Sequence, residues 1–391
     1  MVEHVTENHG VGGSIPPLGT IFDLVTPCLL LDRSRLERNA ARMRSKVAEL
    51  GVTLRPHVKT SKSIDVLKVV AGGEPITITV STLAEARHFF ERGVSDILYA
   101  VGIAPVKLAE ATELVRSGCR LRVILDTVEA AAALASCAEE TGTPIEALIE
   151  IDSDGKRAGV EADDPLLIEI GRRLGGQLAG VMTHAGGSYD CRSTAEFEAI
   201  AEQERALAVR AAQRLRDAGL RCDVVSVGST PTVHYGRSLD GVTEARAGVY
   251  VFGDLVQAEL GTCAIEDIAI GVIASVIGHN RQHGRVLIDA GFLALSRDRG
   301  TADLPVDWGY GAVCDPVSGE VLADLTVSST NQEHGIVTAR SGEIDFERFP
   351  VGSRVKILPN HACATAAAYD RYFVTDGGDR VVAVWDRVNG W

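Results

Sequence analysis

The stretch TPCLLLDRSRLERNAARMRSKVAELGVTLRPHVK, residues 26–59, contains one full cycle of the pattern that decides the fold. It begins with the apolar run CLLL and ends with VTLRPHV, and both runs are typical of buried strands. Between them, apolar residues recur every three or four positions, and Gly51 follows the segment as glycine often follows a helix. The stretch therefore predicts a strand, a helix and a second strand, the unit from which parallel sheets are built.

The same alternation continues to about residue 255. The predicted strands are residues 26–32, 53–59, 75–81, 96–102, 120–126, 145–152, 177–185 and 222–228. Eight strands alternating with helices predict an α/β fold in which a parallel sheet closes into a (β/α)8 TIM barrel. The length of this region fits the roughly 250 residues that such barrels need.

The alternation of predicted strands and helices ends after about residue 263. Strand-like runs joined by Gly- and Asp-rich turns replace the helices, which predicts a C-terminal all-β domain. We expect the barrel to occupy residues 20–262 and the β domain residues 263–391. Residues 1–19 are expected either to pack on the β domain or to be disordered.

Composition excludes some classes of function. The net charge is -14, which argues against nucleic-acid binding, because that depends on clustered Lys and Arg. No apolar run reaches the roughly 18 residues needed to cross a bilayer. The start, MVEHVTENHGVGG, lacks the basic and apolar regions of a secretion signal. We therefore expect a cytoplasmic protein that binds neither nucleic acid nor membrane.

Polar side chains gather where the predicted strands end. The active site of such a barrel lies at these C-terminal ends, and Lys59 ends the strand 53–59. The other polar residues at or just beyond strand ends are Asp126, Asp152, Arg157, His184 and Tyr189. A single Lys at this place is most simply explained by an ion pair with an acid, whereas the whole set favours an active site.

The segment GSTPT, residues 228–232, follows the last predicted strand. Its backbone N–H groups and the hydroxyls of Ser229 and Thr230 can surround a phosphate, and the neighbouring loops are the usual phosphate site of this fold. Alone, the segment predicts an ordinary turn. Together with Lys59 it indicates a phosphorylated cofactor that forms an imine, which is pyridoxal 5'-phosphate.

The segment NHACA, residues 360–364, predicts a metal site. In an extended chain side chains alternate, so His361 and Cys363 would point to the same side. An imidazole and a thiolate on one face suit a divalent metal such as zinc, and two protein ligands leave positions open for catalysis. The alternative is a surface His beside a buried Cys, and spacing alone leaves both open.

With these residues in place, the sequence resembles the family of D-serine dehydratases and D-threonine aldolases, which are fold-type III pyridoxal-phosphate enzymes related to alanine racemase. The resemblance rests first on RPHVKT, which contains Lys59. Further matches follow in order: TPCLLLD at 26–32, EIDSDGKRAGV at 150–160, THAGGSY at 183–189, SVGSTPT at 226–232, ARAGVYVFGD at 245–254, LIDAGF at 287–292, QEHG at 332–335 and PNHACAT at 359–365. No single motif decides, but the ordered set is specific and favours the metal interpretation.

The resemblance implies a role for each candidate residue. Lys59 would hold the cofactor as an imine and then remove the Cα proton of the substrate. Arg157 would lie near the phenolic oxygen of the cofactor, and His184 and Tyr189 would line its ring. The phosphate would be bound by Ser229, Thr230 and nearby backbone, including that of Gly228, Gly248 and Tyr250. His361 and Cys363 would bind a divalent metal, zinc by preference.

The implied reaction is the dehydration of a D-β-hydroxy amino acid. The cofactor takes up the electrons left at Cα, and the metal assists the departure of the β-hydroxyl, which leads to a 2-keto acid and ammonia. His-x-Cys is the metal motif of the dehydratases, whereas the aldolases carry His-x-Asp. Retro-aldol cleavage to glycine and an aldehyde is the alternative. A non-catalytic pyridoxal-phosphate-binding protein is a third, but such carriers resemble the barrel alone.

Two departures from the family pattern affect the substrate more than the cofactor. Ser61 stands where the motif often has His, and Gly187 stands where a His or polar residue is frequent. D-serine is the expected substrate, with D-threonine and 3-hydroxyaspartate left open. Arg55 and His57 would either shape the charge around Lys59 or serve the structure. Relatives of this fold commonly form homodimers, so a homodimer is expected.

Overall fold

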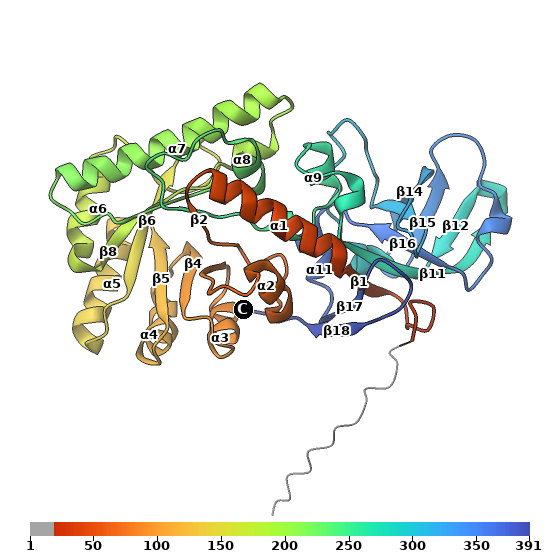
Figure 1. The fold of residues 1–391 in the computed structure, drawn as a ribbon, viewed down its shortest axis with the longest axis horizontal. Coiled ribbons are helices and arrows are strands. Elements are labelled where there is room, and N and C mark those ends of the chain that lie inside the picture. Colours follow the sequence, from red (N-terminus) through yellow and green to blue (C-terminus); the bar gives the residue numbers. More distant parts are fainter. Residues whose placement is uncertain (1–18) are drawn as a thin grey trace, which may run out of the picture.

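The computed structural model describes residues 19–391. The expectation for residues 1–19 therefore lies outside the described residues, except for Gly19. Figure 1 shows a barrel surrounded by helices and, beside it, a second part made mainly of strands. The helix α1 (Arg33–Glu49) runs along the molecule from one part toward the other.

The first part is the predicted parallel barrel. Its strands are β2 (Thr53–Leu54), β3 (Ile78–Val80), β4 (Asp96–Gly102), β5 (Arg120–Leu125), β6 (Glu146–Asp152), β8 (Leu178–Met182), β9 (Val224–Val227) and β10 (Glu244–Ala245). Their order in the sheet is β2-β10-β9-β8-β6-β5-β4-β3, and β7 (Val160–Glu161) pairs with β6 off this path. A parallel bridge between His57 and Thr79 joins the two ends of the path, so the barrel is closed.

One predicted barrel strand is wrong, and one barrel strand was missed. The segment predicted as the first barrel strand forms β1 (Cys28–Asp32), which pairs with β11 and β17 in the other sheet. The place in the barrel is taken by β10, only two residues long and not predicted. All five residues of β1 are buried, and a fully buried run carries no periodicity that tells one sheet from another.

The helices follow the strands as the periodicity predicts, and several begin at a polar capping residue. After α1 they are α2 (Ile64–Ala71), α3 (Leu83–Phe90), α4 (Leu108–Arg116), α5 (Val128–Thr141), α6 (Leu166–Leu174), α7 (Thr194–Asp217), α8 (Thr230–Tyr235) and α9 (Leu255–Glu259). At the start of α1, the Asp32 carboxylate accepts a hydrogen bond of 3.0 Å from the backbone N–H of Arg35. At the start of α7, Ser193 and Glu196 form a capping box.

The second part is the predicted all-β domain. Its strands are β11 (Ile270–Asn280), β12 (Arg285–Ile288), β13 (Ala312–Cys314), β14 (Val321–Thr330), β15 (Gly335–Ala339), β16 (Arg354–Leu358), β17 (Arg371–Thr375) and β18 (Ala383–Asp386). The sheet order is β12-β15-β14-β13-β16-β11-β1-β17-β18, and the pairing of β12 with β11 closes six of these strands into a ring. Two short helices, α10 (Phe292–Leu295) and α11 (Ala362–Ala366), interrupt the strands. The boundary at 262/263 stays a prediction.

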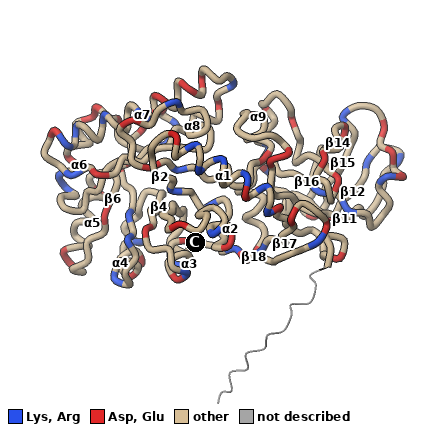
Figure 2. The backbone as a smooth tube through the Cα atoms, viewed as in Figure 1, with Lys and Arg blue, Asp and Glu red and all other residues tan. Residues whose placement is uncertain are grey.

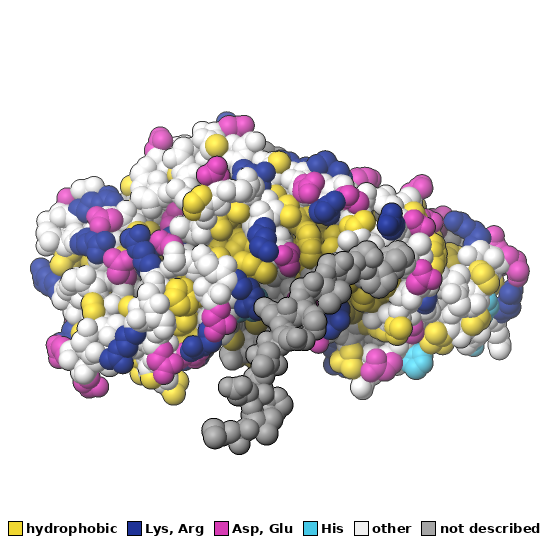
Figure 3. Space-filling view, turned by 60° about the horizontal axis from the view of Figure 1, so that its bottom comes forward, with side chains coloured by type: hydrophobic (Ala, Val, Ile, Leu, Met, Phe, Trp, Pro, Cys, Tyr) yellow, Lys and Arg dark blue, Asp and Glu magenta, His cyan; other side chains and the backbone are white. Residues whose placement is uncertain are grey.

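One hydrophobic core runs from the barrel into the β domain. Val58 and Ala247 of the barrel belong to the same buried cluster as Ala362 and Tyr372 of the β domain. Charged side chains of both signs are spread over both parts, and they alternate on the face that Figure 3 shows (Figures 2 and 3). Among the described helices, none combines the length and apolar character that a membrane span requires.

Candidate active site

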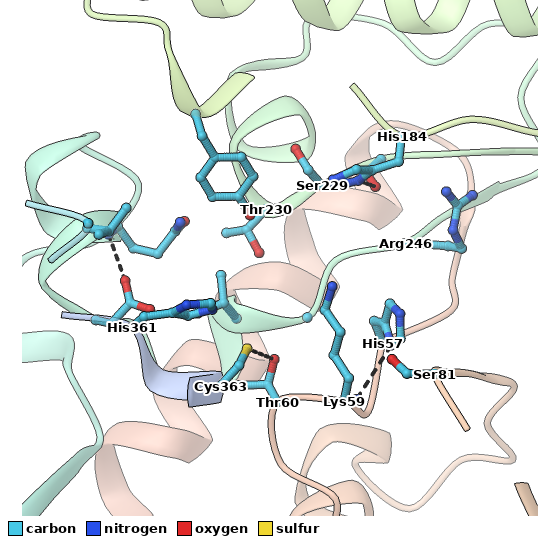
Figure 4. A pocket seen from close by; sticks show the side chains of 18 of the residues that line it. His57, Lys59, Thr60, Ser81, His184, Ser229, Thr230, Arg246, His361 and Cys363 are labelled. Carbon is cyan, nitrogen blue, oxygen red and sulfur yellow. Dashed lines mark hydrogen bonds between the residues drawn. The ribbon is translucent and has the colours of Figure 1, made fainter. Parts of the chain in front are cut away.

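A cavity of ≈ 570 Å³ lies at the C-terminal ends of the barrel strands and extends to the β domain. Its volume falls within the range of small-molecule sites. Figure 4 shows Lys59, Ser229 and Arg246 from the barrel and His361 and Cys363 from the β domain around this space. The site is therefore built jointly by the two parts of the chain.

The cavity brings together all but one of the residues predicted for the site. Those that line it are Lys59, Arg157, His184, Tyr189, Gly228, Ser229, Thr230, Gly248, His361 and Cys363. The exception is Tyr250, whose side chain lines a smaller cavity of ≈ 40 Å³ behind Thr230. Only the backbone N–H of Tyr250 belongs to the loop, where it donates to Thr230 Oγ1 at 3.2 Å.

Lys59 stands in a tight turn directly after β2. The backbone N–H of Lys62 donates to the carbonyl of Val58 at 2.7 Å and closes the turn. The Lys59 N–H donates to Nδ1 of His57 at 3.4 Å. Burial, with the charge of Lys59 and Arg246, holds the pKa of His57 well below its usual range, so this imidazole is neutral. His57 therefore shapes the turn without adding a charge.

Arg55 has a structural role and does not shape the charge around Lys59. Its guanidinium is buried inside the barrel, where Nε donates to Glu244 at 2.8 Å and Nη1 donates to Asp96 at 2.8 Å. The two strand-end acids predicted with the site also serve loops. Asp126 accepts from the N–H of Gly159 at 3.0 Å, and Asp152 accepts from that of Gly155 at 2.7 Å.

The segment 228–232 forms the start of α8 and leaves polar groups facing the cavity. Ser229 caps the helix by accepting from the N–H of Thr232 at 3.2 Å. Gly228 has φ +119°, and a Cβ there would lie 2.9 Å from the Arg246 carbonyl oxygen, so only glycine fits. The hydroxyls and the first N–H groups of this turn form a cradle suited to an anion. The cradle and the Lys59 amine line the same cavity, a combination that fits pyridoxal phosphate.

Two further groups face the same space. Nδ1 of His184 lies 3.2 Å from the carbonyl oxygen of Gly228, and burial together with the charge of Arg157 lowers the pKa of His184 to about 3. Arg246 is buried, and its guanidinium donates to Ser226 Oγ at 2.7 Å and to the Thr183 carbonyl at 2.5 Å. Arg246 was not predicted for the site although it stands in the motif ARAGVYVFGD, because the strand that ends beside it was not recognised.

The metal motif differs in backbone from the prediction. His361 is extended, but the chain then turns into the short helix α11, so Cys363 lies in a helical turn rather than in a strand. The carboxylate of Asp254 fixes this turn by accepting from the N–H of Ala362 at 2.9 Å. Both side chains still reach the cavity, because the first turn of α11 lines it.

Partners on both sides orient the two candidate ligands. Nδ1 of His361 donates to Asp298 Oδ2 at 2.7 Å, and Thr60 Oγ1 lies 3.1 Å from Cys363 Sγ (Figure 4). Burial raises the pKa of Cys363, but the hydrogen bond and charge of His361 outweigh it and lower the pKa. Burial lowers the pKa of His361, but Asp298 and Cys363 raise it overall.

This thiolate and imidazole are the donor set that zinc prefers, so the residues fit the expected metal. Within residues 19–391 no cluster of three or more His, Cys, Asp or Glu side chains is arranged to hold a metal ion. A metal here would therefore keep positions open for other ligands. Asp298 was missed from the sequence because it stands in a loop between α10 and β13, 63 residues before its partner.

Comparison with known proteins agrees with this arrangement. The family model of the alanine racemase N-terminal domain matches residues 31–256, and that of the putative serine dehydratase domain matches residues 269–375. A D-threo-3-hydroxyaspartate dehydratase of Delftia sp. (strain HT23) is 50% identical over 95% of this chain and 99% of its own length. A D-serine dehydratase of Dictyostelium discoideum is 33% identical over 93% of this chain and 96% of its own length.

Solved structures extend the comparison. That of the Delftia dehydratase superposes with a TM-score of 0.92 at 51% identity, covering 95% of this chain and 100% of its own. A D-threonine aldolase from Filomicrobium marinum superposes with a TM-score of 0.79 at 25% identity, covering 94% and 97%. The barrel, the lysine at its mouth and the β domain define a fold-type III pyridoxal-phosphate protein. The chain belongs to the alanine racemase-like family of D-serine and D-3-hydroxyaspartate dehydratases.

Proposed function

We propose that this protein is a lyase, dependent on pyridoxal phosphate and a divalent metal, that dehydrates D-β-hydroxy amino acids to 2-keto acids and ammonia. D-Threo-3-hydroxyaspartate, D-serine and D-threonine are the candidate substrates. The observation that carries the proposal is that His361 and Cys363 line the same cavity as Lys59. An amine for proton transfer at Cα and a pair of metal ligands thus face one substrate-sized space.

The residues around Lys59 would hold the cofactor. Lys59 would bind it through Nζ, and the hydroxyls and N–H groups at Ser229 and Thr230 would bind its phosphate. When bound, pyridoxal phosphate draws electrons from Cα and so makes its proton removable. We assign the Lys59 amine as the base that receives the Cα proton. Arg246, held by Ser226 and Thr183, keeps a positive charge at the cavity wall.

His361 and Cys363 would hold the metal, with zinc preferred for its affinity for sulfur and imidazole. A divalent metal there supplies a Lewis acid for a departing hydroxyl. Support comes from the Delftia dehydratase, of which a Cys-to-Ala variant is known in a metal-free form and a His-to-Ala variant is also known. The replaced His and Cys of that enzyme are two positions apart, as His361 and Cys363 are.

Dehydration is favoured over retro-aldol cleavage by the relatives. Dehydratases match at 50%, 33% and 30% identity, whereas a 3-hydroxy-D-aspartate aldolase and a D-threonine aldolase match at 26% and 28%. We further infer a cytoplasmic homodimer. Val101 lines the cavity mouth with 45% of its surface exposed, and Val106 nearby in sequence is 87% exposed. A second copy covering the mouth would bury this apolar rim.

The test is to incubate the protein, loaded with pyridoxal phosphate and zinc, with each of the three D-amino acids. Equal amounts of 2-keto acid and ammonia are expected, with no release from the L-enantiomers. Light scattering on the same sample should give twice the mass of one chain. Absence of keto acid from all three D-amino acids would reject the proposed function.

A further inference from the structure

We propose that Thr60 is a positioning residue for the metal site: its hydroxyl holds the Cys363 sulfur in place, so the affinity for the metal depends on the same turn that carries Lys59. This inference rests on the proposed function, because it assumes that Cys363 is a metal ligand. It concerns a residue of the barrel, whereas both metal ligands belong to the β domain.

The contact itself is specific. Thr60 directly follows Lys59 and is fully buried, with 0% of its surface exposed. Its Oγ1 lies 3.1 Å from Cys363 Sγ, drawn as a dashed line in Figure 4. In the described part of the chain this sulfur is the hydrogen-bond partner of the hydroxyl. A cysteine that binds a metal does so as a thiolate, which has no proton to give. The hydroxyl of Thr60 is then the donor.

The direction of this hydrogen bond has a geometric consequence. The hydrogen bond from Thr60 occupies one side of the Cys363 sulfur. The remaining lone pairs of the sulfur stay available toward the cavity and toward His361. The hydrogen bond from His361 Nδ1 to Asp298 does the same for the imidazole. Each candidate ligand thus has one fixed partner. Such partners orient the ligands of metal sites, and their loss typically lowers metal affinity 10- to 100-fold.

Thr60 is held firmly enough to act in this way. Thr60 Oγ1 lies beside Gly248, where an added Cβ would come within 3.3 Å of it, and on its other side lies Cys363 Sγ. The next residue is fixed from the β domain, because the Ser61 carbonyl accepts from Tyr372 Oη at 2.7 Å and from Arg387 Nε at 3.1 Å. The hydroxyl is therefore in position whether or not a metal is bound.

The test measures zinc affinity without turnover. The cofactor-loaded protein is titrated against a chromogenic zinc chelator, and Thr60→Val, which keeps the shape but loses the hydroxyl, is compared with Thr60→Ser, which keeps it. We expect Thr60→Val to lose about 10- to 100-fold in zinc affinity and Thr60→Ser to stay within a few-fold of the unaltered protein. Thr60→Ala replaces Thr60→Val if the latter does not fold.

A matched control variant distinguishes loss of the Thr60 hydroxyl from general destabilisation of the protein. Thr112 is also a buried threonine, and its hydroxyl donates to the Leu108 carbonyl at 2.8 Å within α4. Thr112→Val should therefore leave zinc affinity unchanged. If Thr60→Val binds zinc as tightly as the unaltered protein, or if Thr60→Ser loses as much as Thr60→Val, this inference is wrong. If the unaltered protein binds no more zinc than a Cys363→Ala variant, the metal part of the proposed function fails instead.

Discussion

Asp298 accepts a hydrogen bond of 2.7 Å from Nδ1 of His361. With Nδ1 bonded to Asp298, Nε2 is the nitrogen that would bind a metal, as in many zinc sites where a carboxylate orients a histidine ligand. The pKa of the Asp298 carboxyl is correspondingly lowered by this hydrogen bond. The candidate metal ligand His361 is thus oriented by a residue from a separate loop of the β domain.

Replacing Asp298 should weaken the metal site without removing it. We expect Asp298→Ala to bind zinc roughly 10- to 100-fold more weakly, because the imidazole loses its orienting partner. Metal content after dialysis against graded zinc concentrations measures this. Added zinc should restore the activity of Asp298→Ala but not that of His361→Ala. Equal zinc affinity in Asp298→Ala and the unaltered protein would show that His361 needs no such support.

Lys59 is predicted to be the attachment point of the cofactor. Lys59→Ala should lack the visible absorption that pyridoxal phosphate shows when bound covalently to a lysine, because no other amine is assigned that role. Absorption spectra recorded after removal of free cofactor provide the measurement. Lys62→Ala is the control, since Lys62 stands three residues away but pairs with Glu85 at 3.2 Å. A covalent band that survives in Lys59→Ala would refute the assignment.

Arg55 is predicted to stabilise the barrel from inside. Only 3% of its side chain is exposed, and it bridges Asp96 and Glu244. Arg55→Met should lower the free energy of unfolding by about 3–5 kcal/mol, because it leaves the buried Glu244 carboxylate without its ion-pair partner, whereas Asp96 keeps Arg122 and Arg120. Lys68→Met is the comparison, since the Lys68–Asp65 pair is exposed and should contribute less than about 1 kcal/mol. Similar losses in urea unfolding for both variants would contradict the burial argument.

Lys356 is predicted to make stability rise with pH. It is 4% exposed in β16, and burial together with the charge of Arg35 lowers its pKa from 10.5 to about 8. The charged form is disfavoured in the folded state, so the cost is full below about pH 8 and disappears as the pH approaches 10.5. That shift corresponds to about 3 kcal/mol.

The variant Lys356→Met separates this effect from other titrations. It should be more stable than the unaltered protein at neutral pH, and the difference should shrink as the pH rises through the window. Urea unfolding of both proteins on either side of the window measures it. A difference that does not change with pH would show that the pKa of Lys356 is not lowered by folding.

Most of the fold and of the candidate site could be predicted from the sequence. Short segments show both the periodicity of the helices and strands and the polar residues that follow the strands. Lys59, His184 and Ser229 follow strands that alternation identifies, and closure of the barrel then brings them together. β1 could not be assigned to its sheet, since CLLLD is buried on every side in either location. Arg246 was missed because β10 is too short to show a period.

Contacts between residues that are far apart in the sequence cannot be predicted from local sequence patterns. Thr60 meets the metal motif only through the packing of the barrel on the β domain, across 303 residues of chain, and Asp298 meets it through packing within the β domain, across 63 residues. Tyr250 shows that the backbone and the side chain of one residue can face different spaces. Its backbone stays a predicted phosphate contact, whereas its side chain lines a separate small cavity behind Thr230. Which face of a loop a side chain takes is decided by tertiary packing, not by the motif.

The most direct test of the account is the identity of the bond broken in D-threo-3-hydroxyaspartate. The protein is depleted of metal with a chelator, reloaded with zinc, and the products of both forms are identified by mass spectrometry. We expect oxaloacetate and ammonia from the reloaded protein and neither from the depleted one, because the metal that we assign to His361 and Cys363 would assist loss of the hydroxyl. Glycine and glyoxylate from the reloaded protein would contradict it, since they arise by cleavage between Cα and Cβ.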